Sequence, residues 1–154
     1  DAILIADDSE KSVSSSQGHA LMQNHPYRET RIAQAEKNIN NLLHALKTGD
    51  ESLFVEIVEN EALSLHGLMM TSNPGFVLMK PATLAMIEKI RNFRKGTGIN
   101  ICFTLDAGPN IHLVYLEKDR QAVSEFIDKE LAGLCKNGNW IDDMVGPGPV
   151  KLSL

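Results

Sequence analysis

The sequence has few cysteines and no long hydrophobic run, and each lack excludes a class of protein. Its 154 residues include only two cysteines, Cys102 and Cys135, too few and too widely spaced for a disulfide scaffold or a zinc site with paired ligands. The longest apolar runs, such as residues 2–6, fall far short of the roughly eighteen residues that span a bilayer. With no signal-peptide pattern and with reduced thiols expected, we predict a cytoplasmic protein.

The chain also has fewer positively charged than negatively charged residues. Fifteen Lys and Arg against twenty Asp and Glu give a net charge of −5, so no summed positive field attracts nucleic acid or an acidic membrane. The five histidines form no i,i+4 pair and have no cysteine at ligand spacing, which argues against a metal site. We therefore predict no nucleic-acid partner, no membrane partner and no metal ligands, and any anion has to be held locally.

The composition that remains is that of one folded domain. Hydrophobic residues make up 43% of the chain and charged residues 23%, without a low-complexity tract or an internal repeat. A chain of this length can bury a real core as a single domain, residues 1–154. Because the sequence starts at Asp1 rather than Met, we expect a fragment or a processed form.

Apolar periodicity predicts both strands and helices. The expected strands are residues 2–6, 99–105 and 111–116, with further pieces at 141–145 and 150–154, the last of which could complete a sheet. The expected helices run from 31 to 49, from Asp50 as N-cap to 73, from 81 to 96, and from Asp119 as N-cap to 138. The side chains expected on the core faces of the first and third helices are Ile32, Ala35, Ile39, Leu42, Leu43, Leu46, Leu84, Ile87, Ile90 and Phe93.

The order of these elements is strand, helices, strand, hairpin turn, strand, helix, strand. That order is the split βαβ pattern of ferredoxin-like domains, with the first connection enlarged by extra helices. We therefore predict an α+β fold, a ferredoxin-like split βαβ sheet with an enlarged helical layer on one face.

The residues of greatest chemical interest lie in two loops. Residues 103–110 read Phe-Thr-Leu-Asp-Ala-Gly-Pro-Asn, so a strand ends in a carboxylate, Asp106, followed at once by turn-forming residues. Gly108 allows close backbone approach and Pro109 fixes φ, so the turn would hold Asp106 in a defined direction. An ordinary hairpin loop uses the same residue types, and from composition alone that interpretation is favoured.

The second loop is rich in serine. Residues 14–18 read Ser-Ser-Ser-Gln-Gly, and hydroxyls with backbone amides before a helix suit an anion such as phosphate. An ordinary polar loop is the alternative, and the Gly-Lys-Ser/Thr ending of a P-loop is absent. His66 lies in the second long helix, where a hydrogen-bonded packing role is favoured over catalysis. His112 follows the Asp106 turn and could border a site there.

Together the two loops resemble one family. Residues 13–18 resemble the Val-Ser-Ser-x-x-Gly segment of diphosphomevalonate decarboxylases, and residues 103–110 resemble that family's aromatic-Thr-x-Asp-Ala-Gly-Pro-Asn motif. Residues 60–74, with Ser64, His66, Ser72 and Pro74, are similar to the family's intervening helix. The resemblance covers essentially the whole chain and implies the C-terminal half of a GHMP kinase superfamily member, with the N-terminal ATP-binding half absent.

The resemblance implies an ATP-dependent reaction that converts mevalonate 5-diphosphate to isopentenyl diphosphate in the mevalonate pathway of isoprenoid synthesis. Asp106 matches the catalytic aspartate, which accepts or orients the proton of the 3-hydroxyl group. Matched residues for the small-molecule diphosphate substrate are Ser15, Ser16 and Ala107, with Ser14, Gly18 and Asn110 as further pocket candidates. ATP and Mg²⁺ would be bound mainly by the missing half and none by this chain, so we expect the fragment alone to be inactive.

Two departures from the family pattern leave the substrate open. His19 stands where many members have methionine, and Ser16 stands where threonine or arginine is usual. A relative acting on mevalonate or its monophosphate, or a 3-kinase that stops before decarboxylation, would share much of this half. A non-catalytic ferredoxin-like regulatory module is the alternative from another class. Family members are commonly homodimers, but no pattern marks a dimer surface, because the apolar stripes are all explicable as core.

Overall fold

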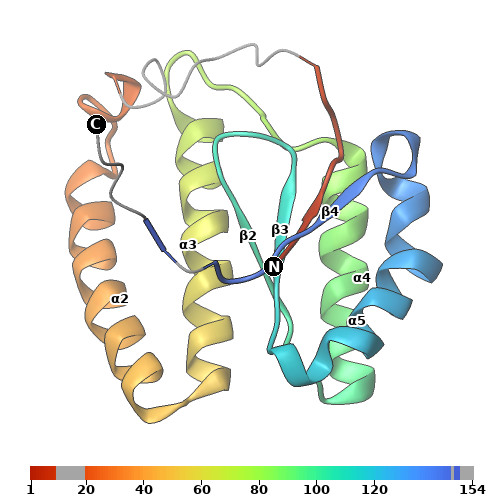
Figure 1. Cartoon of the computed structure of the whole chain (residues 1–154). Helices are drawn as coiled ribbons and strands as arrows, with labels where there is room; N and C mark the ends of the chain where they lie inside the picture. Colours follow the sequence, from red (N-terminus) through yellow and green to blue (C-terminus); the bar gives the residue numbers. More distant parts are fainter. Residues whose placement is uncertain (10–19, 147, 150–154) are drawn as a thin grey trace, which may run out of the picture.

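The computed structural model describes residues 1–9, 20–146 and 148–149 and has an α+β fold (Figure 1). Its main elements are β1 (Ala2–Leu4), α2 (Arg28–Thr48), α3 (Glu51–Thr71), α4 (Pro81–Thr97), β2 (Cys102–Leu105), β3 (Ile111–Val114), α5 (Arg120–Phe126) and β4 (Trp140–Asp142). A 3₁₀ turn, Glu117–Asp119, precedes α5. The π turn Ile127–Leu131 and the 3₁₀ turns Ala132–Leu134 and Lys136–Gly138 follow α5.

The four strands form one antiparallel sheet in the order β2-β3-β1-β4. β1 lies inside the sheet, where Leu4 pairs with Ile111 of β3 on one side and with Trp140 of β4 on the other. This order is that of the predicted split βαβ sheet, so the predicted fold class is confirmed. The strand that closes the sheet is Trp140–Asp142, which starts one residue before the first of the two predicted tail pieces, 141–145, and overlaps it. Residues 150–154, the second piece, lie outside the described residues.

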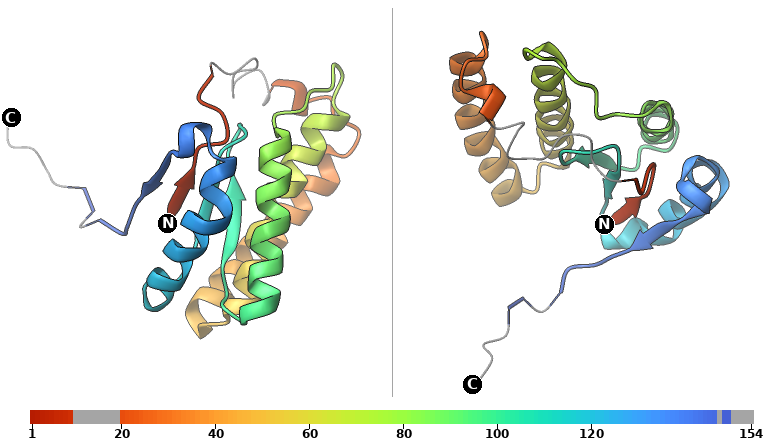
Figure 2. Two further views of the ribbon diagram at one scale, coloured as in Figure 1. Left: turned by 90° about the vertical axis from the view of Figure 1, so that its right-hand side faces the viewer. Right: turned by 90° about the horizontal axis from the view of Figure 1, so that it is seen from above.

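The core lies on the helix-covered face of the sheet. Alternate residues of neighbouring strands point to this face, and Leu4, Ile111 and Phe103 are fully buried there. Met86 and Ile90 of α4 pack in the same cluster. Figure 2 shows α4 and α5 on one side of the sheet, α3 beside β2, and α2 outside α3. The helical layer is therefore built mainly on α3, α4 and α5.

Local residue types set three helix boundaries where the sequence predicts them, whereas Asp119, the predicted N-cap of α5, makes no side-chain capping hydrogen bond and α5 ends at Phe126. Gly49 adopts the left-handed conformation (φ 72°) and its N–H donates to the Ala45 carbonyl, which ends α2. The Asp50 carboxylate accepts a hydrogen bond from the Leu53 N–H at 3.0 Å, which confirms Asp50 as the N-cap of α3. Pro81 opens α4, as is typical of the first turn of a helix.

The core face predicted for α4 is partly wrong. Ile87 and Ile90 are buried as predicted, but Leu84 is 55% exposed. Thr83 and Met86, both 0% exposed, take its place. The inward face thus starts at Thr83, whose hydroxyl group bonds to the Pro109 carbonyl. Leu84, the next residue, is rotated about 100° around the helix axis and so faces away from the core.

The core face predicted for α2 is wrong to a larger extent. Four of its six residues are between 40% and 61% exposed, namely Ile32, Ile39, Leu43 and Leu46. α2 instead turns polar side chains toward α3, because Arg31 forms an ion pair with Glu61 and the Asn38 amide donates to Glu61 Oε1 at 2.6 Å. Ala45 is the buried residue of α2. The expectation that every apolar stripe is explained as core therefore does not hold.

Candidate functional site

Asp106 lies at the turn that joins β2 to β3. The strands pair in register up to Leu105 and Ile111, and the Asp106 residue itself is exposed. Gly108 is buried, and its N–H donates to the Asp106 carbonyl at 2.8 Å. Ala107, predicted to line a pocket, is half-buried beside it. The predicted hairpin is therefore confirmed, with an exposed acidic residue at its turn.

His66 of α3 contacts the start of this turn. Its ring is 1% exposed, and its Nε2 lies 3.1 Å from the Asp106 carbonyl oxygen. Because a carbonyl oxygen only accepts, Nε2 carries the proton and donates. Burial lowers the pKa of His66, and the hydrogen bond to the Asp106 carbonyl opposes that shift only in part. His66 is a buried, hydrogen-bonded histidine, as predicted from its position.

Thr83 of α4 contacts the other end of the turn. Its hydroxyl group donates to the Pro109 carbonyl at 2.7 Å and accepts from the Lys80 N–H at 3.1 Å. Thr83 is 0% exposed, so its hydroxyl group is removed from water. The turn is thus held at both ends by helices that are distant from it in sequence.

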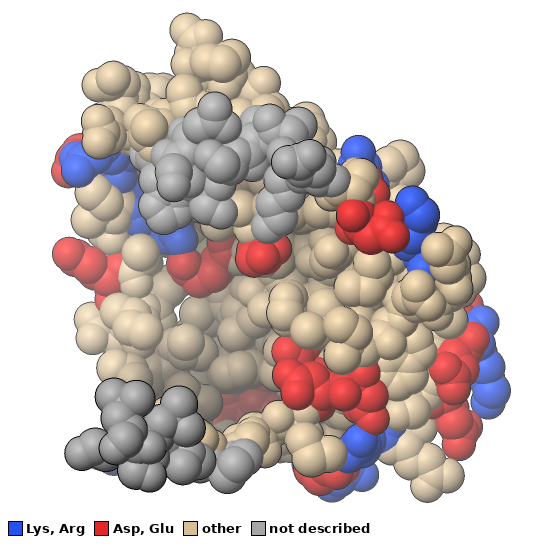
Figure 3. Space-filling view, turned by 45° about the horizontal axis from the view of Figure 1, so that its top comes forward, with Lys and Arg blue, Asp and Glu red and all other residues tan. Residues whose placement is uncertain are grey.

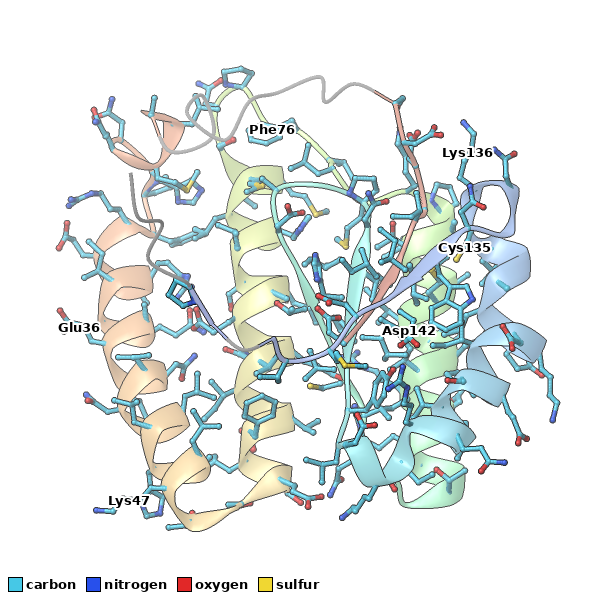
Figure 4. The ribbon with its side chains drawn as sticks, viewed as in Figure 1. Glu36, Lys47, Phe76, Cys135, Lys136 and Asp142 are labelled. Atoms are coloured by element: carbon cyan, nitrogen blue, oxygen red, sulfur yellow. The ribbon has the colours of Figure 1, made fainter. Side chains whose placement is uncertain are left out.

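The chain that leaves β1 makes a third contact. The Asp7 N–H donates to Asn110 Oδ1 at 3.1 Å, so the Asn110 side chain joins this chain to the turn. The Ser9 N–H, which donates to Asp7 Oδ1, and the Lys80 ammonium group lower the pKa of the Asp7 carboxyl. On the other side, Lys136 donates its N–H to the Ile5 carbonyl at 2.6 Å, and Figure 4 shows Lys136 beside this chain.

The serine loop itself lies outside the described residues. This applies to Ser14, Ser15, Ser16 and Gly18, and also to His19. The segments on both sides of it are described, and both lie at the end of the molecule that carries the β2–β3 turn (Figure 1). Asp7 contacts the turn, and His25 Nε2 lies 3.1 Å from Thr71 Oγ1 at the end of α3.

His112, predicted as a possible neighbour of Asp106, lies elsewhere. It pairs in register with Ile3 of β1, and its Nδ1 lies 3.1 Å from Asp1 Oδ2. Since β1 runs from Asp1 toward Asp7, His112 is associated with the end of β1 that is farther from the Asn110 contact.

No metal cluster is found in the part of the chain that the structure describes, where no group of three or more His, Cys, Asp or Glu side chains is arranged to hold an ion. Among the same residues, no helix is both long and apolar enough to cross a bilayer.

A separate cavity of about 310 Å³ lies at the other end of the β2–β3 hairpin. Its walls come from the end of α2, the start of α3 and the two strands, and they include Leu46, Phe54, Cys102, Val114 and Leu116. The space-filling view shows the surface hollowed immediately to the right of α2, which stands at the left as in Figure 1 (Figure 3). Burial raises the pKa of the Cys102 thiol to about 12, so this thiol is a poor nucleophile.

Thr83 contacts the candidate site but is not among the residues predicted from the sequence. A polar residue on the buried face of α4, three positions before Met86, was the pattern that could have revealed it. A fully buried hydroxyl group requires a hydrogen-bond partner, and in this fold that partner is the backbone of the candidate site.

Comparisons with known proteins show which family the chain resembles. The family model described as the mevalonate 5-diphosphate decarboxylase C-terminal domain matches residues 2–144. A phosphomevalonate decarboxylase of Haloferax volcanii is 27% identical over 111 residues, which are 72% of this chain and 34% of that protein.

Solved structures are similar over most of the chain. A mevalonate diphosphate decarboxylase from Legionella pneumophila has a TM-score of 0.82 and 28% identity, over 91% of this chain and 44% of that one. MDDEF in complex with MVAPP, AMPPCP and magnesium has a TM-score of 0.78 and 27% identity, over 87% of this chain and 41% of that one. The chain thus spans less than half the length of these relatives.

Proposed function

The chain belongs to the family of mevalonate 5-diphosphate decarboxylase C-terminal domains, and from this premise we propose that it supplies the substrate-binding half of an ATP-dependent decarboxylase. The longer protein would convert mevalonate 5-diphosphate to isopentenyl diphosphate. The observation that carries the proposal is the placement of Asp106, which is exposed at a turn tied to α3, α4 and the chain after β1.

In this proposal Asp106 acts on the tertiary 3-hydroxyl group of the substrate. Its carboxylate accepts or orients the hydroxyl proton, so that the oxygen can attack the γ-phosphoryl group of ATP. The phosphorylated intermediate then loses phosphate and carbon dioxide. A fixed turn matters here, because misplacing a reacting group by about 1 Å can cost on the order of a hundredfold in rate.

The serine loop is proposed to hold the phosphate groups. Ser15 and Ser16 would donate to the phosphate oxygens, with Ser14 and Gly18 beside them and Ala107 lining the pocket. Support comes from the flanking segments, which contact the turn through Asp7 and the end of α3 through His25. The Asn110 side chain already accepts from Asp7, so we assign it to holding this flank in place.

ATP and Mg²⁺ are assigned mainly to the part of the longer protein outside this chain. Mg²⁺ is usually held by one or two carboxylates together with the phosphates of a nucleotide, so we expect it where ATP binds. A similar solved structure contains AMPPCP and magnesium, and this chain covers 41% of it. When bound, ATP supplies the phosphoryl group, and this domain supplies the acidic residue and the substrate contacts.

The proposal treats residues 1–154 as one GHMP kinase C-terminal-type domain. The longer protein would be a cytoplasmic enzyme that acts on a small phosphorylated molecule. The family resemblance implies a homodimer, and sedimentation of the longer protein tests that oligomeric state. Two buried, unpaired thiols, Cys102 and Cys135, are consistent with a reducing compartment.

A second candidate substrate is mevalonate 5-phosphate. The Haloferax volcanii relative is named a phosphomevalonate decarboxylase, whereas the Legionella pneumophila structure is of a mevalonate diphosphate decarboxylase. Measuring kcat/KM of the longer protein with both compounds separates the two candidates. We expect preference for the diphosphate, because two phosphate groups give the serine loop more acceptors.

The test of the proposed function is Asp106→Asn in the longer protein. The amide keeps the size of the side chain but cannot take the proton, so we expect turnover to fall by about a hundredfold or more while substrate binding is largely kept. Asp128→Asn is the matched control, because Asp128 is also exposed but lies on the turn after α5. Near-normal turnover in Asp106→Asn would overturn the proposal, as would ATP-dependent release of carbon dioxide by residues 1–154 alone.

A further inference from the structure

His66 contacts the backbone of Asp106. From this geometry we propose that His66 is a positioning residue for Asp106, and the inference rests on the proposed function of that carboxylate. The Nε2–H group of His66 holds the Asp106 carbonyl oxygen at 3.1 Å and so fixes the direction in which the carboxylate leaves the turn.

The Asp106 carbonyl oxygen accepts two hydrogen bonds. One comes from His66 Nε2 at 3.1 Å and the other from the Gly108 N–H at 2.8 Å. A carbonyl oxygen has two lone pairs, so both bonds are satisfied together. The peptide group between Asp106 and Ala107 therefore cannot rotate without losing both, and the direction of the Asp106 Cα–Cβ bond is set with it.

The proton on Nε2 is required by the chemistry of the contact. The carbonyl oxygen has no hydrogen to give, so of the two neutral tautomers only the one with hydrogen on Nε2 makes the bond. Burial lowers the pKa of His66, which keeps the ring neutral near pH 7. A neutral donor holds the backbone without placing a positive charge beside the carboxylate.

The helix that carries His66 is itself fixed against the strand that carries Asp106. Glu59, about two turns earlier in α3, binds Arg94 of α4 at 2.6 Å, and Arg94 also donates to the Ile101 carbonyl just before β2 at 2.6 Å. His66 is thus a fixed point from which the turn can be held.

Packing alone does not explain a histidine at this position. A fully buried polar ring costs free energy unless it is hydrogen-bonded, whereas leucine or methionine would fill a similar volume without that cost. Thr83 provides a parallel case, since it too is 0% exposed and bonds to a backbone carbonyl of the same turn. Two buried polar side chains from different helices thus hydrogen-bond to the backbone of one turn.

Three substitutions separate positioning from packing in the longer protein. The glutamine amide nitrogen reaches roughly where Nε2 lies, the asparagine amide nitrogen lies closer to Nδ1, and leucine offers no donor. We expect His66→Leu and His66→Asn to lower kcat by about 10- to 100-fold with KM changed less than threefold, and His66→Gln to recover most of the loss. His44→Gln, at an exposed histidine of α2, is the control for the exchange itself.

A second measurement on residues 1–154 needs no activity. The Gly108 amide donates to the same carbonyl oxygen, so its hydrogen exchange reports on the order of the turn. We expect exchange at Gly108 to speed up by about tenfold or more in His66→Leu and His66→Asn, but not in His66→Gln, with protection in α4 unchanged.

The two measurements fail in different ways. If the longer protein lacks decarboxylase activity, the proposed function fails, while the Gly108 exchange pattern still decides the role of His66. If Gly108 exchange is unchanged in every variant, or if asparagine restores kcat as well as glutamine does, the positioning role is overturned. Should His66→Leu not fold, the contrast between glutamine and asparagine decides alone.

Discussion

The helices α2 and α4 show the same kind of apolar repeat in sequence but differ in what they bury. α4 buries Thr83, Met86, Ile87 and Ile90 against the sheet, whereas the buried residue of α2 is Ala45. α4 also supplies a hydrogen bond to the Asp106 turn, and α2 contacts α3 largely through polar side chains. The repeat therefore identifies an amphipathic helix but not the surface that covers it.

The difference has a physical cause. Apolar side chains gain free energy only when a neighbour removes them from water. α4 meets a sheet face made of Leu4, Phe103 and Ile111, while α2 lies outside α3 with Ile39, Leu43 and Leu46 still at least half exposed. The two side chains that bond to the backbone of the Asp106 turn, His66 and Thr83, are themselves 1% and 0% exposed, so water competes little for these hydrogen bonds.

The largest expected difference in stability is between one isoleucine of α4 and one isoleucine of α2. Ile90→Ala removes a side chain that is 0% exposed, and we expect about 3 kcal/mol of lost unfolding free energy from transfer and cavity terms. Ile39→Ala, at a position 51% exposed, should cost under about 1 kcal/mol. Urea denaturation of residues 1–154 measures both, and equal losses would contradict the comparison.

The next effect concerns two glutamates of α3. Glu59 is 5% exposed and bridges Arg91 and Arg94 of α4, whereas half-buried Glu61 faces Arg31 of α2. Glu59→Gln should destabilise by about 2 kcal/mol, below the range for a fully buried pair because Arg91 remains partly hydrated. Glu61→Gln should cost about 0.5 kcal/mol. The same denaturation curves check the ranking, and a larger loss at Glu61 would reverse it.

A smaller effect is expected from two threonine hydroxyl groups. Thr83→Val keeps the shape of the side chain but leaves the Pro109 carbonyl without its donor, which should cost about 1 to 2 kcal/mol. Thr48→Val removes an exposed hydroxyl group bonded to the His44 carbonyl at the end of α2, where water can replace it, so about 0.5 kcal/mol or less is expected. Thermal unfolding distinguishes the pair, and a Thr83→Val midpoint equal to wild type would argue against a fixed turn.

The smallest effect is a pH dependence that is specific to α3. The pKa of His66 is lowered in the folded protein by burial, so as pH falls the unfolded chain binds this proton first. The free energy of unfolding should therefore be highest above about pH 6.5, and it should decrease as the pH falls from that value toward the folded pKa of His66. His66→Gln should flatten this part of the curve, and His44→Gln should not. Identical slopes of unfolding free energy against pH for wild type and His66→Gln, between about pH 7.5 and about pH 5, would contradict the prediction.

Part of the candidate site was accessible from sequence because it is local. The residue order around Asp106 predicts a strand, a turn and a second strand, and β2 and β3 form that hairpin. The contacts that hold the turn were not accessible, since they join His66 and Thr83 to carbonyls 40 and 26 positions away. Backbone carbonyls carry no residue identity, so no pattern of side chains marks them as partners.

The sequence by itself determined the elements, their order and the two loops that carry chemistry, because turn residues, caps and apolar periods act over a few neighbouring positions. Gly49 and Asp50, which end one helix and begin the next, are the clearest case. Tertiary structure alone decided which helix faces became core and which polar side chains came to hold Asp106. Those outcomes depend on which surfaces exclude water from one another, and that is fixed only when sheet and helices are assembled.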